Sequence, residues 1–282
     1  LGALWLIVAT GAAVRLTDSG LGCRHWPGCE AGHPLPAKNY NAYIEFGNRL
    51  VGGVTIVLTL VALAAAWRTP GLARWVRRLA AAIFVGTLAQ APLGYLAVKT
   101  DLRWPIVMAH LLLSMLLLAG AVVLALEAYG LARGRAAPVV PAELRRGGLA
   151  LAPLCLALLV SGAFATAAGP HSGGGTTHVH RFGKLGSLVY VHAGVVAVFG
   201  CSFLLALGYL AARRQVAPRL FRFGLAVLAL LLAQVALGET QYRTHLPWGL
   251  VLVHVAVAAT VWAGVVALVV LFWRPPAPFA RT

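Results

Sequence analysis

Polar side chains recur at matched points in two long apolar parts of the chain. The segment AQAPLGYLAVKTDLRWPIVMAH, which begins at Ala89, aligns without a gap with AQVALGETQYRTHLPWGLVLVH, which begins at Ala233. The same shift carries His110 onto His254 and Asn48 onto His192. This repeat predicts two halves of parallel topology that arose by duplication.

The histidines of the second half suggest a metal chemistry. We expect each of these four positions to lie a few residues after the helix end that faces the outside of the membrane. The two members of each pair should therefore lie at similar depth in the membrane. Facing imidazoles in a helix bundle can bind haem iron from both sides. A single intramembrane histidine can be a packing residue, but two at matched depth predict that His192 and His254 are haem ligands. Zinc would require three or four close ligands, and the sequence suggests none inside the membrane.

The composition predicts the elements that position these side chains. Of 282 residues, 60% are hydrophobic and 11% are charged, which is typical of a multi-pass membrane protein. We expect an all-α integral membrane protein, because a spanning barrel would show short alternating strands. The eight predicted helices cover 1–14, 42–66, 77–98, 105–130, 149–168, 187–212, 220–242 and 247–273. We expect the first to be short because the chain starts inside it, without a Met before Leu1.

The basic residues predict the orientation. Arg and Lys are more frequent in the breaks after the second, fourth and sixth predicted helices and in the C-terminal tail, so these should face the cytoplasm. Both termini are then cytoplasmic, and the four polar positions lie toward the outer face of the cytoplasmic membrane. We expect an N-terminal half at 1–131, a linker at 132–147 and a C-terminal half at 148–282. The net charge of +16 follows this loop pattern, and no nucleic-acid-binding motif accompanies it.

The first outer loop contains the stretch CRHWPGC. Its cysteines, Cys23 and Cys29, could form a disulfide in an oxidising compartment. Metal binding with the nearby His25 and His33 is the alternative.

The sequence resembles the haem A synthase family. The resemblance rests on VRLTDSGLGCRHWPGC, on IEFGNRL at the start of the second predicted helix, and on the histidines at 110, 192 and 254. It implies eight transmembrane helices as two tandem four-helix halves, and a Cys23–Cys29 disulfide. It also implies that His192 and His254 bind a haem b cofactor and that the substrate haem O lies near Glu45, Asn48 and His110. The implied reaction oxidises a ring methyl group of haem O to a formyl group, which gives haem A for terminal oxidases.

The chain departs from the family pattern at Asn48, where the Glu-x-x-His-Arg motif has histidine. A second outer cysteine pair, found in some relatives, is replaced by GPHSGGGTTHVHRFG. Asn binds haem iron poorly compared with imidazole. We therefore expect His110 to bind the substrate iron alone, with Asn48 hydrogen-bonded to water or to an iron-bound oxygen species in a more open site. The opposite reading is that this half is inactive.

Other polar residues of the first half have predicted roles at the same site. Glu45 precedes Asn48 by three residues on one helix face, and we expect it to handle protons as the catalytic residue. The alternative is an ion pair with Arg49 or Arg15. Both arginines could bind haem propionates or could be interfacial residues. Gln90 could contact the haem edge or form a hydrogen bond between helices.

Two other classes of function remain open. A dihaem b electron-transfer or quinol-oxidising subunit would need two histidines in both halves, which Asn48 does not supply. A transporter would predict broken helices and a site at the membrane midplane. For the synthase we expect membrane lipid, a haem O synthase, oxidase assembly factors and an unidentified electron donor as partners.

Overall fold

The fold is entirely helical in a computed structural model, which describes residues 1–25, 28–30, 32–33, 35–36 and 38–280. The helices are α1 (Gly2–Leu16), α2 (Tyr40–Arg68), α3 (Arg74–Lys99), α4 (Trp104–Arg133), α5 (Ala142–Gly148), α6 (Leu151–Ala168), α7 (Leu185–Ala212), α8 (Pro218–Arg243), α9 (Trp248–Trp273) and α10 (Ala277–Ala280). The predicted all-α membrane class is confirmed.

Seven helical segments of the described chain are long and apolar enough to cross a membrane. One of them runs from α5 through α6. The apolar helix α1 has 15 residues, fewer than the roughly 20 that a bilayer core requires. Helices α5 and α10 were not predicted, because each is short and lies in a polar or proline-containing stretch without apolar periodicity.

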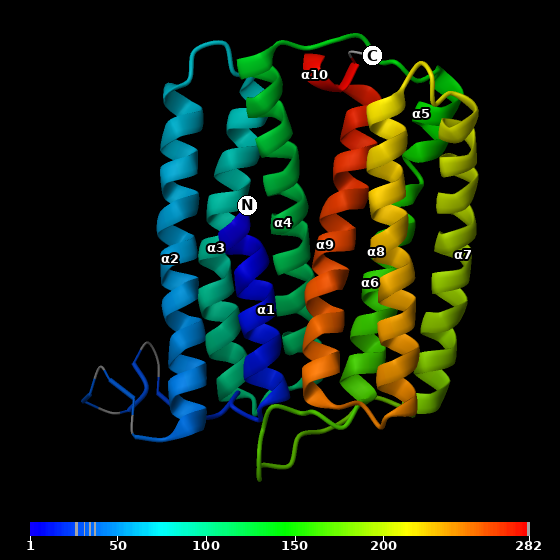
Figure 1. Ribbon diagram of the computed structural model, residues 1–282. Helices are drawn as coiled ribbons and strands as arrows, with labels where there is room; N and C mark the ends of the chain where they lie inside the picture. Colours follow the sequence, from blue (N-terminus) through cyan, green and yellow to red (C-terminus); the bar gives the residue numbers. More distant parts are fainter. Residues whose placement is uncertain (26–27, 31, 34, 37, 281–282) are drawn as a thin grey trace.

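The long helices lie alongside one another, with α1 to α4 on one side and α6 to α9 on the other (Figure 1). In the first group α1 packs on α2, α2 on α3, α3 on α4 and α4 on α1. In the second group α6 packs on α7, α7 on α8, α8 on α9 and α9 on α6. Helix α2 is therefore diagonally across from α4, and α7 from α9. Helix α9 also contacts α1 and α4, so it occupies the centre of the molecule.

Tryptophans connect the central helices. Trp262 of α9 is buried and donates a hydrogen bond of 2.7 Å to the carbonyl oxygen of Met115 in α4. Trp5 of α1 donates one of 3.0 Å to Thr260 Oγ1 of α9. A buried indole N–H needs such an acceptor, so both side chains fix the two groups of helices relative to each other.

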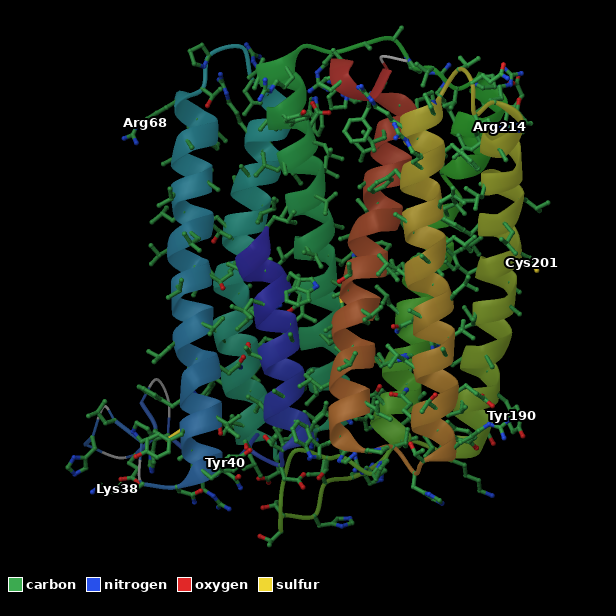
Figure 2. The ribbon with its side chains drawn as sticks, in the orientation of Figure 1. Lys38, Tyr40, Arg68, Tyr190, Cys201 and Arg214 are labelled. Atoms are coloured by element: carbon green, nitrogen blue, oxygen red, sulfur yellow. A yellow bond between two sulfur atoms is a disulfide. The ribbon has the colours of Figure 1, made fainter. Side chains whose placement is uncertain are left out.

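Side chains on the outer surface of the bundle are strongly apolar. Tyr190 and Cys201 of α7 point away from the other helices (Figure 2), and Leu205 of the same helix is 77% exposed. Such a surface is compatible with lipid rather than water. Arg68 and Arg214 lie at one end of the bundle, opposite Lys38 and Tyr190 (Figure 2). The loops after α2 and α7, which the sequence predicts to lie on the same side of the membrane, therefore lie at the same end of the bundle.

A buried carboxylate lies at the end of the bundle that contains Arg68 and Arg214, which we call the Arg-rich end. Glu127 of α4 is 1% exposed and forms ion pairs with Arg135, from the segment after α4, and with Arg274, just after α9. The Arg274 contact is 2.7 Å from Nε to Oε1. This cluster joins the end of α4 to the end of α9.

Candidate functional site

His192 of α7 lies against α6. Its Nδ1 is 2.9 Å from Ser161 Oγ, and the Ser161 hydroxyl is also 2.9 Å from the carbonyl oxygen of Leu158. A Cβ atom at Gly162 would lie 3.1 Å from His192 Cε1. The absence of a side chain at Gly162 therefore lets the imidazole lie against the backbone of α6.

Asn48 of α2 has the equivalent environment against α1. Thr10 Oγ1 lies 2.7 Å from Asn48 Oδ1, and Gly11 faces the same amide. Thr10 and Asn48 are 38 residues apart in the sequence, whereas the Ser161 and His192 pair is 31 residues apart. The alignment without a gap could not show this equivalence, because the loop after α1 is longer than the loop after α6.

His110 and His254 also have equivalent environments. Gln90 Nε2 of α3 donates to the carbonyl oxygen of His110 over 3.2 Å, and Gln234 Nε2 of α8 donates to that of His254 over 2.9 Å. Gly94 faces the His110 ring in the way that Gly238 faces the His254 ring. The structure therefore gives Gln90 an interhelical hydrogen bond, one of its two predicted roles, and gives Gln234 the equivalent bond.

Four buried polar atoms at these positions have no hydrogen-bond partner within the described residues. They are His110 Nδ1, Gln90 Oε1, His254 Nδ1 and Gln234 Oε1. Leaving a buried polar atom unpaired costs about 1–3 kcal/mol. The same atoms are unpaired in both halves, which fits imidazoles that bind a group other than the protein.

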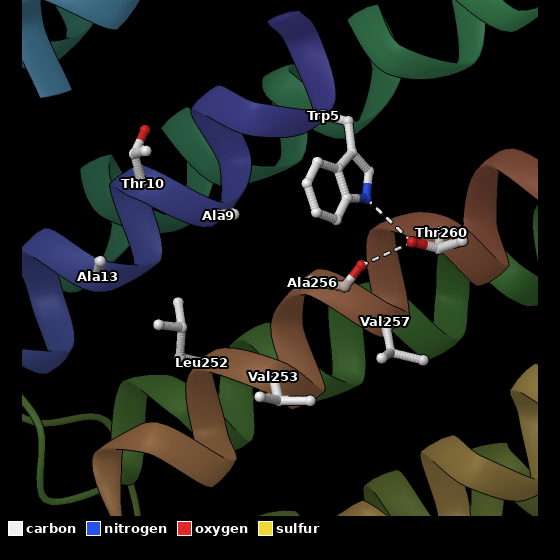
Figure 3. A pocket seen from close by; sticks show the side chains of 9 residues that line it. All are labelled: Trp5, Ala9, Thr10, Ala13, Leu252, Val253, Ala256, Val257 and Thr260. Carbon is white, nitrogen blue, oxygen red and sulfur yellow. Dashed lines mark hydrogen bonds between the residues drawn. The ribbon is translucent and has the colours of Figure 1, made fainter. Parts of the chain in front are cut away.

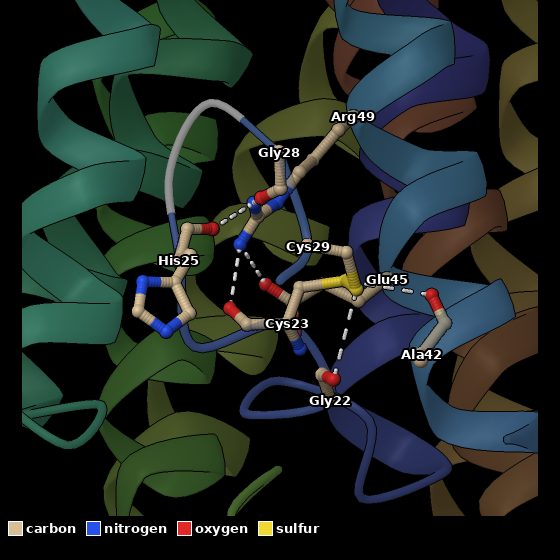
Figure 4. A network of polar contacts seen from close by, with 8 residues as sticks. All are labelled: Gly22, Cys23, His25, Gly28, Cys29, Ala42, Glu45 and Arg49. Atoms are coloured by element: carbon tan, nitrogen blue, oxygen red, sulfur yellow. Dashed lines mark hydrogen bonds and ion pairs between the residues drawn. A yellow bond between two sulfur atoms is a disulfide. The ribbon is translucent and has the colours of Figure 1, made fainter. Parts of the chain in front are cut away.

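Glu45 faces the disulfide loop (Figure 4). Its carboxylate is buried and accepts a hydrogen bond of 2.7 Å from the backbone N–H of Cys23. It also pairs with Arg49, whose Nη2 lies 2.6 Å from Glu45 Oε1. The alternative of a Glu45–Arg49 ion pair is therefore present, and both carboxylate oxygens have partners.

Arg49 holds the loop through three backbone carbonyl groups. It donates to the carbonyl oxygens of Cys23 and His25 over 2.8 and 2.7 Å, and also to that of Gly28 (Figure 4). Cys23 and Cys29 form the predicted disulfide. Both cysteines are therefore engaged with each other, and no group of three or more His, Cys, Asp or Glu side chains in the described chain could hold a metal.

Arg15 connects α1 to the loop after α6. It donates to the carbonyl oxygens of His171 and Thr166 over 2.9 and 2.7 Å. Arg181 donates to the same His171 oxygen, and its partial burial lowers the pKa of its guanidinium while Asp18 opposes that shift. No ion pair joins Arg15 to Glu45 within the described residues. Arg15 instead connects the end of α1 to the end of α6 and to the loop that follows it.

Two apolar grooves adjoin the equivalent hydroxyl residues. One, of about 390 Å³, lies between α1 and α9 and is lined by Thr10, Trp5 and Leu252 among others (Figure 3). The other, of about 510 Å³, lies between α6 and α7 and includes Ser161. Sequence reasoning missed Thr10 and Ser161, although the shared Thr-Gly-Ala and Ser-Gly-Ala triplets could have indicated them.

The fold and site define a multi-pass helical membrane protein with two equivalent pairs of polar positions across its helices. A family model described as cytochrome oxidase assembly protein, COX15-CtaA, matches residues 1–266. The chain belongs to this family.

Similar proteins from several bacteria share one name. A protein named "Heme A synthase" from Shewanella oneidensis is 26% identical over 98% of this chain and 95% of its own. Proteins of the same name are 42% identical in Lysinibacillus sphaericus, over 32% of this chain and 29% of theirs, and 34% identical in Bacillus licheniformis, over 44% and 41%.

Proposed function

We propose that the protein is a haem A synthase, an oxidoreductase that converts haem O to haem A for the assembly of terminal oxidases. The reaction oxidises a ring methyl group of haem O to a formyl group. The observation that carries this proposal is the recurrence of one set of contacts around Asn48 and His110 and around His192 and His254. The family and the names of the relatives support it.

His192 and His254 would hold the haem b cofactor. Their helices α7 and α9 lie diagonally across the second group, and both imidazoles are half-buried. When bound, haem b supplies one-electron transfer. Ser161 and Gly162 orient His192, and Gly238 leaves room for the His254 ring.

His110 and Asn48 would bind and orient the substrate haem O. His110 would bind the substrate iron, and Asn48, which is a poor iron ligand, would orient the substrate through hydrogen bonding. Gln90 fixes the backbone at His110 through its hydrogen bond. The two haem sites therefore differ in ligation, with the closed one at His192 and His254.

The outer wall of the substrate site would come from Glu45, Arg49 and Arg15. Glu45 handles protons in methyl oxidation, and Arg49 holds its carboxylate in place through their ion pair. Arg49 and Arg15 donate hydrogen bonds to loop carbonyl groups and so hold this wall in place. Their guanidinium groups would also bind the haem propionates.

The architecture of this enzyme would be eight spans in two tandem four-helix halves, 1–131 and 148–282, joined by a cytoplasmic linker at 132–147. Helix α1 completes the first group in the way that α6 completes the second, which supports counting it as a span. The Arg-rich end would be cytoplasmic, so both termini lie inside and the haem sites lie toward the outer face. A haem O synthase, oxidase assembly factors and an electron donor would be its partners.

Complementation tests this function. The chain would be expressed in a bacterium that makes haem O but lacks its own haem A synthase, and extracted haems would be separated by chromatography. We expect haem A from the wild type and only haem O from His110→Ala. Membrane-inserted wild-type protein that leaves haem O unconverted would contradict the proposal.

A further inference from the structure

We propose that Thr10 and Ser161 are positioning residues that give the two haem sites opposite hydrogen-bond polarity. Ser161 holds His192 so that the lone pair of Nε2 is free to bind iron. Thr10 holds Asn48 so that its amide N–H groups, rather than its oxygen, face the substrate. This inference rests on the proposed function.

The single proton of the Ser161 hydroxyl fixes the tautomer of His192. The hydroxyl donates to the carbonyl oxygen of Leu158, which has no proton of its own and can only accept. Toward His192 Nδ1, at 2.9 Å, Ser161 must then act as the acceptor. Nδ1 therefore carries the imidazole proton, and Nε2 keeps the lone pair that a metal requires.

The hydrogen bond of Thr10 has the opposite direction. Thr10 Oγ1 is 2.7 Å from Asn48 Oδ1 but 3.4 Å from the carbonyl oxygen of Ile7, so its proton is directed to the amide oxygen. Because that oxygen is engaged by α1, the NH₂ group of Asn48 is the end left for the substrate. An amide N–H donates and has no lone pair for iron.

The neighbouring glycines support this assignment for both residues. Gly11 and Gly162 each follow the hydroxyl residue, and both face the side chain that it holds. A Cβ atom at Gly162 would press on the His192 ring at 3.1 Å. The hydroxyl and the glycine thus together set the orientation of the Asn48 or His192 side chain. A hydroxyl that contributed only to helix packing would not need an adjacent glycine that faces this side chain.

The Ser161 assignment is tested by the redox and spectroscopic properties of purified, haem-loaded protein. In Ser161→Ala the Nδ1–H group loses its acceptor, which weakens imidazole as a donor to iron. We expect a higher midpoint potential of haem b, a shifted low-spin EPR signal and haem loss about tenfold faster. Ser161→Thr should restore all three.

Ser202→Ala is the matched control, because Ser202 is on the same helix as His192 and its hydroxyl donates to the carbonyl oxygen of Val198 over 2.9 Å. An unchanged potential and EPR signal in Ser161→Ala would overturn the assignment of Ser161.

The Thr10 assignment is tested with carbon monoxide on the reduced protein loaded with haem O. A haem held by two histidines does not bind this probe, so the signal reports the substrate site. An N–H donor near bound CO lowers the C–O stretching frequency, whereas a lone pair raises it. Thr10→Val frees the amide to turn, so we expect its C–O band to split or shift to higher wavenumber.

Thr10→Ser should keep the wild-type band. Thr55→Val on α2 is the matched control, because the Thr55 hydroxyl donates to the carbonyl oxygen of Val51 in its own helix. A CO band that is the same in Thr10→Val and wild type would overturn the Thr10 assignment alone. Wild-type protein that binds no haem would instead overturn the proposed function.

Discussion

The backbone N–H of Cys23 donates to Glu45 Oε2 over 2.7 Å, so a carboxylate of α2 directly holds the disulfide loop. Arg49 completes this connection, because it binds Glu45 and the carbonyl oxygens of the same loop. Asn48 lies about one turn after Glu45 on the same helix. A change in the conformation of the disulfide loop should therefore alter the position of Asn48.

Replacing Glu45 with Gln should stop haem A formation and loosen the loop. The neutral amide cannot balance the charge of Arg49 or act as a base at this site. We expect an unchanged haem b spectrum, strongly reduced haem A output in complemented cells, and faster reduction of the disulfide by a phosphine reductant. Glu239→Gln is the control, because Glu239 also pairs with an arginine four residues later but is exposed. Normal haem A output from Glu45→Gln would contradict the catalytic role.

Removing the disulfide should lower stability. The Cys23–Cys29 bond closes a loop with a sequence separation of 6, for which chain entropy gives about 2 kcal/mol. We expect the double change Cys23→Ser and Cys29→Ser to lower the unfolding temperature measured in detergent. Cys201→Ser, at an exposed free cysteine, should not. Equal unfolding temperatures for all three proteins would show that the loop does not contribute to the folded state.

The second-half histidines should be needed for haem b. His192→Ala and His254→Ala each remove one proposed ligand, so the purified variants should lose most of their haem b absorbance. His180→Ala is the control, because this histidine lies exposed in the loop between α6 and α7. Full haem b content in either ligand variant would exclude that residue as a ligand.

The ion pairs at the Arg-rich end should contribute to stability without affecting chemistry. Glu127→Gln leaves Arg135 and Arg274 without their carboxylate, and because both arginines are partly exposed we expect a loss of about 1–3 kcal/mol. Thermal unfolding would measure this loss against Glu143→Gln, which alters an exposed residue of α5. Unchanged stability would show that solvent compensates both arginines.

The sequence could predict the long helices because their apolar stretches are bounded by Arg, Pro and Gly. The predicted ends differ from the structure by a few residues, as at α2, where Asn39 caps the helix and moves its start to Tyr40. The repeat located Gln90 and Gln234, and the structure gives them the same hydrogen bond. Such local and periodic features can be identified in one sequence.

Contacts across the fold could not be predicted in the same way. Glu45 was expected near Asn48 on one helix face, but its partner Cys23 comes from a loop whose conformation the sequence does not specify. The hydrogen bonds of Arg15 to carbonyl groups of the other half could not be predicted either. These contacts depend on how the loops fold back over the helices.

The haem content and carbon monoxide reactivity of the purified wild-type protein test the central claim most directly. We predict two haems per chain, of which haem b does not bind carbon monoxide and the substrate haem does. Asn48→His should abolish that reactivity, because a second imidazole would close the open position. A colourless, folded protein, or two haems that both fail to react in the wild type, would contradict the account.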